Sequence, residues 1–425
     1  MSPFTADAAA ALPGPPWLQV LRTSAAERAA GAVFPTEAEE IWRYSRISDL
    51  DLDAYTLAGP TTPLGASDDA IAAAVAGTKA TIPERAGLVM VVDGQVVHHE
   101  VDPALAERGL RVTDAQAPGS MGAIMNEAPD VYAELNTAFA TAPIVIEVPD
   151  GLAVGVPVVV AHFTATEGLL TMPRVVVRLG TDSELTVLDH HSSADVRALT
   201  LPVAELEAGP GARLRYLAVN LLGPRVWQIA SQVARAGTSS STLVANVALG
   251  GDYARVRTDA RLDGKGAAGD QLAAYFGEGD QMHDFRTLQD HAAPKTTSDL
   301  LFKGAVEGRA RSVYSGLIRV RKEAPGTSAF QTNRNLKLSD AAWADSVPNL
   351  EIDTNDVRCS HASTVGPIDA EQRFYLESRG VPPERAEELI VNGFFSEVLE
   401  RLPVKAMVEP LRAHIAAKLA RRHAA

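Results

Sequence analysis

The chain has 425 residues, of which 46% are hydrophobic, and its formal net charge at pH 7 is −14. This apolar content is ordinary for a globular protein and excludes general disorder. The length allows two or three domains, or one large core with appendages. The acidic balance argues against nucleic acid or an anionic membrane surface as the main partner.

The cysteine content and the hydrophobic runs indicate the compartment. A single cysteine excludes an internal disulfide bond and fits a reducing compartment. Residues 1–7 contain no basic stretch of the kind that begins a secretory signal. No run approaches the roughly 20 apolar residues that span a bilayer. We therefore expect a cytoplasmic protein with no nucleic-acid partner and no membrane partner.

The N-terminal region reads as a mixture of short elements. Residues 1–16 are rich in alanine, proline and glycine, which predicts a loose tail. Ser24 and Thr36 are each followed by a glutamate three residues later, and this capping-box pattern predicts a helix start at each position. Residues 61–80 are expected to form a loop and a short helix. Asp93-Gly94 separates two short apolar runs and predicts the turn of a β-hairpin.

From Ile144 onward the helical period disappears for more than 200 residues, and glycine-containing turns recur at a nearly constant interval. Their first glycines are spaced by 29, 28 and 27 residues, and each turn is followed by a strand-like run. Such a period predicts a solenoid in which each turn of the chain buries its apolar face on its neighbours. A β-sandwich would show turns every 8–12 residues or so without this longer register. Many small residues suit a narrow interior, so we predict a parallel β-helix. The four glycines are Gly180, Gly209, Gly237 and Gly264.

After Pro367 the pattern becomes helical. One helix is expected between Asp369 and Gly380, a second from Pro383 to Leu402, and a third from Val404, kinked at Pro410 and basic at its end. Three short helices make a thin core on their own. We therefore expect them to dock on the solenoid, on a partner, or on both.

The pattern as a whole predicts a mainly β chain in three parts. Residues 1–140 form an N-terminal mixed helical region with a small hairpin, residues 141–367 the β-helix, and residues 368–425 a C-terminal helical region.

Cys359 and His361 are the leading candidate site residues. Two positions apart on a strand, they lie on the same face, and both are ligands suited to zinc, copper or iron–sulfur chemistry. Two ligands cannot close a tetrahedral site, so another segment or another subunit would have to complete it. The alternatives are a small buried thiol with a hydrogen-bonded core histidine, or a nucleophilic pair. A separation of roughly 6–7 Å between the two Cα atoms is long for direct activation.

The other histidines are weaker candidates. His98-His99 and His190-His191 are adjacent pairs whose members point to opposite faces of a strand, so neither pair chelates an ion as a unit. A polar cluster further along is either catalytic or a turn-facing ladder typical of solenoids. Its members are His283, Asp284, Asp290, His291 and Lys295. The sequence has neither a P-loop motif nor a C-x-x-C pair, so it hydrolyses no nucleotide through a P-loop and holds no four-cysteine cluster by itself.

Several of these segments together resemble the SufB/SufD family of iron–sulfur cluster assembly proteins. The resemblance is close over residues 280–400 and implies a right-handed parallel β-helix flanked by helical regions. The segments that carry it are Glu40–Ser45, His283–Thr287 with His291, Thr296–Gly304, Tyr314–Gly316, Gln331–Leu336, Pro348–Ile352, Asp356–His361 and Phe374–Gly380.

Within the family the chain looks most like SufD, because SufB-like chains are longer and carry several cysteines. The SufD role is that of a scaffold rather than an enzyme. The resemblance implies that His361, with Cys359 beside it, contributes to a transient iron–sulfur cluster shared with a SufB-like partner. No tightly bound cofactor is expected in the isolated chain, which could also pair with itself. Ala362 replaces the usual glycine after the histidine, which changes backbone freedom but leaves the ligand in place.

The resemblance also implies that a SufC-like ABC ATPase binds the C-terminal helices, at residues 383–402 and 404–420. This agrees with the missing P-loop, since the nucleotide chemistry would lie on the partner. Flavin binding by the complex would be allowed, although no dinucleotide fingerprint supports it.

Three other functions are alternatives to the SufD-like scaffold role. The chain could be a SufB-like paralogue, or a β-helix enzyme acting on polysaccharide, which would need paired carboxylates that are not evident. It could also be a purely structural interaction module.

Overall fold

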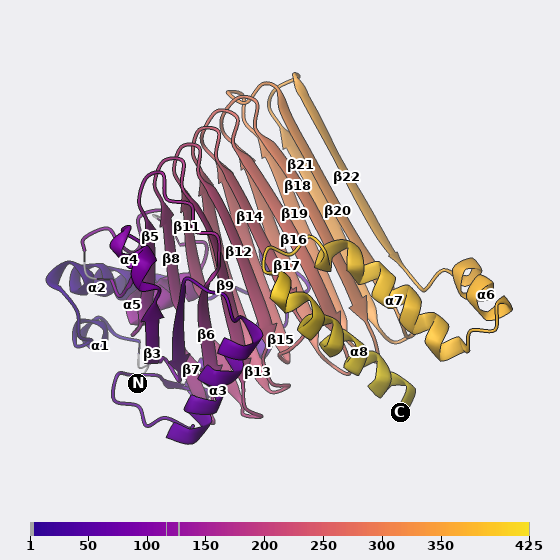
Figure 1. Cartoon of the computed structure of the whole chain (residues 1–425), viewed down its shortest axis with the longest axis horizontal. Helices are drawn as coiled ribbons and strands as arrows, with labels where there is room; N and C mark the ends of the chain where they lie inside the picture. Colours follow the sequence, from indigo (N-terminus) through magenta and orange to yellow (C-terminus); the bar gives the residue numbers. More distant parts are fainter. Residues whose placement is uncertain (1–3, 116, 126–127, 425) are drawn as a thin grey trace.

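The computed structural model describes residues 4–115, 117–125 and 128–424. Its centre is a β-helix in which successive long strands alternate between two sheets (Figure 1). The predicted mainly β solenoid is confirmed, with helices at both ends of the chain. One sheet contains, along its path, β21 (Trp343–Ile352), β19 (Arg311–Val320), β17 (Met282–His291), β15 (Tyr253–Leu262), β13 (Val226–Ala236), β11 (Val203–Ala208), β8 (Arg174–Leu179), β5 (Pro143–Val148) and β4 (Arg111–Thr113), with β1 (Thr56–Leu57), β7 (Leu169–Thr171) and β10 (Ala198–Thr200) beside it.

The second sheet faces the first. It contains, in order, β22 (Val357–Gly366), β20 (Thr327–Lys337), β18 (Thr297–Val306), β16 (Ala268–Gly277), β14 (Ser241–Ala248), β12 (Arg213–Leu221), β9 (Glu184–Ser193), β6 (Val158–Thr164), β2 (Gly87–Val92) and β3 (Gln95–Val101). Tyr253 pairs with Met282, and Met282 with Arg311, so one turn of the chain takes 29 residues here. Inward side chains such as Val158, Val187 and Leu206 pack into the interior core.

The glycine repeat is explained by the stacking of the turns. The amide of Gly209 donates to the carbonyl oxygen of Leu179 at 2.9 Å, and the amide of Gly237 donates to that of Ala208 at 2.9 Å. A Cβ atom on Gly264 would lie 2.0 Å from the backbone nitrogen of Thr238. Glycine is therefore required where each turn approaches the previous one so closely.

The predicted hairpin is confirmed, with β2 and β3 antiparallel. It belongs to the solenoid sheet, because β2 also pairs in parallel with β6. The predicted loop and short helix over residues 61–80 correspond to α3 (Asp68–Thr81). The three-part domain division stays a prediction.

Three expectations for the N-terminal region are wrong. Residues 4–16 are not a loose tail, since they contain α1 (Ala6–Ala10), whose Ala9 is fully buried. Ser24 lies inside α2 (Pro16–Gly31), whose proline start fixes the first turn instead. At Thr36 the backbone amide does bond to Glu39, at 3.2 Å, but only a single 3₁₀ turn, η1 (Glu40–Trp42), follows. The remaining short elements of this region are η2 (Ile47–Asp49), η3 (Leu52–Ala54), α4 (Pro103–Glu107) and α5 (Val131–Phe139).

The C-terminal helices dock on the solenoid. α7 (Pro383–Leu399) and α8 (Val408–Ala424) lie across the outer face of the second sheet, and α6 (Ala370–Ser378) lies beyond β22 (Figure 1). Phe395 and Leu411 pack with Leu217 and Leu272 of that sheet. The predicted kink at Pro410 is wrong, because η4 (Lys405–Met407) precedes α8 and Pro410 falls in the first helical turn, where no backbone donor is needed.

Charged side chains also hold α8 in place. Lys418 and Arg421, part of the predicted basic helix end, both bond to Glu278 of the solenoid, at 3.1 and 2.7 Å. Among the described helices, none combines the length and apolarity required to cross a membrane.

Buried arginines attach the N-terminal segment to the first sheet. Asp284 is fully buried and accepts hydrogen bonds from Arg255 at 2.5 Å and Arg286 at 2.6 Å. Each arginine also donates through its Nη2 atom to the N-terminal segment: Arg255 to the carbonyl oxygen of Ile41, and Arg286 to that of Arg43. Asp284 is therefore the anion that keeps both guanidinium groups in position.

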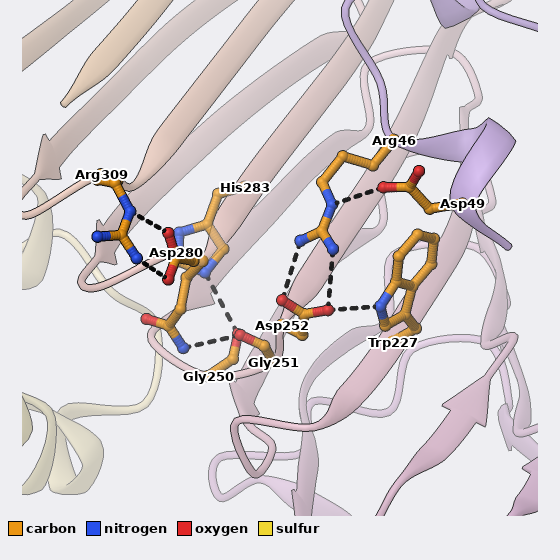
Figure 2. Close-up of polar contacts among 10 residues, drawn as sticks. Arg46, Asp49, Trp227, Gly250, Gly251, Asp252, Asp280, His283 and Arg309 are labelled. Carbon is orange, nitrogen blue, oxygen red and sulfur yellow. Dashed lines mark hydrogen bonds and ion pairs between the residues drawn. The ribbon is translucent and has the colours of Figure 1, made fainter. Parts of the chain in front are cut away.

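A cation–π contact and partly exposed ion pairs also bind the N-terminal segment to the first sheet. The Arg255 guanidinium lies 3.8 Å from the ring centre of Trp42. Beside it, Arg46 bridges Asp49 and Asp252, and Asp252 also accepts from the Trp227 indole at 2.7 Å (Figure 2). The N-terminal segment is thus bound along several turns of the solenoid.

We predict that Asp284→Asn lowers the free energy of unfolding by about 3–5 kcal/mol, because it leaves two buried guanidinium groups without their counter-charge. Urea denaturation followed by circular dichroism measures this loss. The matched control is Asp280→Asn, since Asp280 pairs with Arg309 in a largely exposed position (Figure 2). The control should change stability little; equal losses in the two variants would contradict the role given to Asp284.

Candidate functional site

Cys359 and His361 lie on β22, the last strand of the second sheet. They stand opposite Ala329 and Gln331 of β20, both of which are buried and face the interior. The two residues therefore continue the interior face, as strand alternation predicts. The Cys359 side chain is half-buried against an apolar cluster that includes Ala329, whereas His361 is exposed. Burial raises the pKa of the Cys359 thiol, and a backbone hydrogen bond at Ala329 opposes this only partly.

The terminal turn of the solenoid leaves apolar side chains uncovered. β21 and β22 end the two sheets, and within the described chain no further strand stacks on either. An open strand edge presents unpaired backbone groups, and solenoid ends usually need a polar capping element. The exposed apolar residues on these two strands are Trp343, Val347, Leu350, Ile352 and Val365. The terminal turn therefore combines exposed apolar side chains with an open strand edge, as binding surfaces often do.

The predicted polar cluster around His283 is not one site. His283 is buried beside the carbonyl oxygen of Gly250, at 3.3 Å (Figure 2), and burial lowers its pKa to about 3. His291 contacts the hydroxyls of Thr296 and Ser298 at 2.8 and 2.9 Å, and burial lowers its pKa to about 4.

The acidic members of that cluster have structural partners as well. Asp284 pairs with Arg255 and Arg286, and Asp290 with Arg321 at 2.5 Å. Arg255 and Arg286 overcome the effect of burial and keep the pKa of Asp284 below its usual value. These contacts support structural roles rather than catalytic ones.

The adjacent histidine pairs are separated by strand alternation, as expected. His98 contacts Glu100 at 3.2 Å, and His99 contacts the carbonyl oxygen of Val112 at 2.8 Å. His190 alternates with the inward His191, and burial lowers the pKa of His190 to about 4.

His191 belongs to an interior group that the sequence reasoning missed. Asp189 and His191 point inward from β9, and His162 points inward from β6, directly opposite His191 in the register. Asp189 Oδ1 lies 3.3 Å from His162 Nε2 and 3.2 Å from His191 Nε2. The Tyr216 hydroxyl of β12 donates to Asp189 Oδ2. We call His162, Asp189 and His191 the interior triad.

Burial and charge act in opposite directions on the interior triad. Burial would raise the pKa of Asp189, but the two imidazoles outweigh it and hold that pKa well below its usual value. Burial lowers the pKa of His162 and raises that of Tyr216 well above its usual value. The sequence did carry a signal for this group: Asp189-x-His191 has same-face spacing, and His162 precedes His191 by 29 residues, one turn of the solenoid.

Comparisons with known proteins agree with this architecture. The family model for the SUF system FeS cluster assembly SufBD core domain matches residues 162–394. An iron–sulfur cluster assembly SufBD family protein of Mycobacterium tuberculosis is 33% identical over 389 residues, which cover 90% of this chain and 88% of the relative. The iron–sulfur cluster assembly protein SufD of Escherichia coli is 28% identical over 396 residues, covering 91% and 89%.

A second SufD, from Bacillus subtilis, is 28% identical over 281 residues, which cover 65% of this chain and 64% of the relative. The match to the core-domain model extends from β6 into α7 and so includes both the interior triad and the terminal turn. The chain therefore belongs to the SufBD family of the SUF system for iron–sulfur cluster assembly.

Proposed function

We propose that this chain is a non-catalytic scaffold subunit that works in the cytoplasm, and that a nascent iron–sulfur cluster is assembled where its terminal turn meets a SufB-like partner. The observation that carries the proposal is the coincidence, on one solenoid end, of an uncovered apolar strand edge and an incomplete ligand set. The edge is β21 and β22; the ligand set is Cys359 and His361.

The two candidate ligands differ in availability. The half-buried Cys359 packs on Ala329, and its raised pKa favours the protonated thiol, which is a poor ligand. The exposed His361 imidazole is accessible to a ligand held by a partner. His361 is therefore the proposed ligand, and Cys359 has a secondary, mainly packing role.

A partner supplies what the terminal turn lacks. Strands added to β21 and β22 would satisfy the free backbone groups and cover the apolar side chains of the turn. The same partner would bring further ligands next to His361, since one or two ligands cannot hold a cluster. We propose a heterodimer with a SufB-like chain, in which the cluster is transient and shared; a second copy of this chain could occupy the same edge when the partner is missing.

For the ATPase we propose docking on the C-terminal helices. Part of the apolar face of α7 packs on the solenoid: Phe395 is buried, and Phe394 contacts Phe395 and the Lys303 ammonium. Among the described residues of the C-terminal helices, the large hydrophobic side chains that remain exposed are Leu389 on α7 and Phe374 and Tyr375 on α6. These three residues define the proposed docking surface for a SufC-like ABC ATPase.

We predict that His361→Ala leaves the complex assembled but reduces its cluster to a small fraction of the wild-type content. Because His361 is exposed, its loss should change the free energy of unfolding by no more than about 0.5 kcal/mol. Iron, acid-labile sulfide and melting temperature are measured on the same anaerobically prepared complex. Cys359→Ser should have a smaller effect on cluster content.

Ser360→Ala is the matched control for this experiment, because Ser360 lies between the two candidates and points to the opposite face of β22. It should leave cluster content unchanged. Normal iron and sulfide in a folded His361→Ala complex would eliminate the ligand assignment.

We predict that Leu389→Asp weakens capture of the ATPase at least tenfold, because removal of a docked leucine costs roughly 1.5–3 kcal/mol. Calorimetric titration of the chain with the purified ATPase measures the change. Val20→Asp is the control, since Val20 is an exposed apolar residue on α2. Unchanged affinity in Leu389→Asp, with a normal melting temperature, would place the ATPase elsewhere.

A further inference from the structure

The interior triad lies at the opposite end of the solenoid from the terminal turn. It spans β6 and β9, whereas Cys359 and His361 lie on β22, at the far end of the same sheet. The cluster chemistry proposed above makes no use of it. From its geometry we propose that the triad is a binding site for one divalent transition-metal ion, of the class of Zn²⁺ or Fe²⁺, that resides in the protein independently of the assembled cluster.

The ligand types suit such an ion. Two imidazoles and one carboxylate, with the remaining positions left to water, form a recurrent ligand set for zinc and for non-haem iron. The candidate ligand atoms of the triad all lie within 4.8 Å of one another. Metal–ligand bonds of about 2.0–2.2 Å place the ligands of a tetrahedral ion roughly 3.3–3.6 Å apart. The distances from Asp189 Oδ1 to the two Nε2 atoms, 3.3 and 3.2 Å, are close to this value.

Internal hydrogen bonds do not explain the arrangement. All three residues are 3–6% exposed. Among the described residues, neither ring nitrogen of His162 nor Asp189 Oδ1 makes a contact with hydrogen-bond geometry, although Asp189 Oδ1 lies 3.3 Å from His162 Nε2. Buried polar atoms are rarely left unpaired unless an ion or a water occupies the space between them. A bound ion would satisfy the polar atoms that converge in the interior triad.

The imidazoles have freedom to converge on an ion. The two rings stack with centres 4.8 Å apart, because His162 and His191 occupy the same register position on neighbouring strands. Coordination requires the rings to turn so that both Nε2 lone pairs point to one position. The contact of His162 Nε2 with Asp189 Oδ1 lacks hydrogen-bond geometry, so this rotation breaks no well-formed hydrogen bond.

The surroundings of the triad provide a hydrogen bond that orients Asp189 and space for water ligands. The Tyr216 hydroxyl, bonded to Asp189 Oδ2, orients the carboxylate as outer groups commonly do at metal sites. Two cavities of about 20 Å³ border the site, one lined by both histidines and the other by Asp189 and His191. A water molecule needs about 10–15 Å³ in a polar cavity, so each can hold one further ligand.

The test uses Co²⁺ as the probe, in a chain that also carries Cys359→Ser and His361→Ala so that the terminal turn binds no ion. The protein is produced in medium with added Co²⁺, which lets the ion bind during folding, and is then dialysed against a chelator. We expect one Co²⁺ per chain, with visible absorption bands of a nitrogen- and oxygen-ligated ion. His162→Gln and Asp189→Asn should each lower the Co²⁺ content at least tenfold.

His190→Gln is the matched control, because His190 is the neighbour of both β9 ligands but points out of the solenoid; it should retain the ion. X-ray absorption on the chain with an intact triad checks the site even if a triad variant fails to fold, and should show imidazole and oxygen ligands. A chain that retains no Co²⁺, variants that retain it fully, or a different ligand set would overturn the proposal. Because these measurements exclude the terminal turn, they are independent of the proposed cluster site.

Discussion

Parallel strands stacked in register, one turn of the chain above the next, are the constraint on which the rest of this protein depends. Adjacent strands lie about 4.8 Å apart, so the nearest neighbour of a residue is the one that follows about 29 positions later. Residues of one type that recur at this interval therefore stack on one another in a column along the solenoid. The glycine column from Gly180 to Gly264 exists because a Cβ would collide with the previous turn. The stacked rings of His162 and His191 follow from the same register.

Stacking pairs the backbone hydrogen-bonding groups of each turn with those of the next turn, except at the terminal turn formed by β21 and β22. At the N-terminal end, the antiparallel strands β3 and β4 complete the two sheets, and the buried pair of Asp284 with its arginines attaches the N-terminal segment along the side. α7 and α8 cover the outer face of the second sheet but not the end formed by β21 and β22. That end therefore leaves apolar residues and His361 exposed, and it is the end at which we propose that a partner binds.

The solenoid was predictable because its turns repeat at a nearly constant spacing in the sequence. The glycine spacing, the Asp93-Gly94 turn and the proline start of α7 are local or repetitive signals, and each was confirmed. The capping box at Ser24 failed because α2 begins at Pro16 and packs through positions such as Ala25 and Ala26, a tertiary preference that a four-residue motif does not contain. At Thr36 the backbone amide does bond to Glu39, but only a single 3₁₀ turn follows. The interior triad was not predicted because its two histidines are one solenoid turn apart in the sequence, and their proximity follows only from the register of neighbouring strands. The sequence also could not predict that Cys359 is half-buried while His361 is exposed, because strand alternation places both on the same face.

The account rests on the terminal turn being the shared surface of the assembly. Hydrogen–deuterium exchange of this chain, alone and with the proposed SufB-like partner, tests that claim most directly. Backbone amides of residues 343–352 and 357–366 should gain protection on complex formation, while the first turns of the solenoid, around residues 143–193, should be unchanged. Protection confined to the first turns, with free exchange in β21 and β22, would contradict the account.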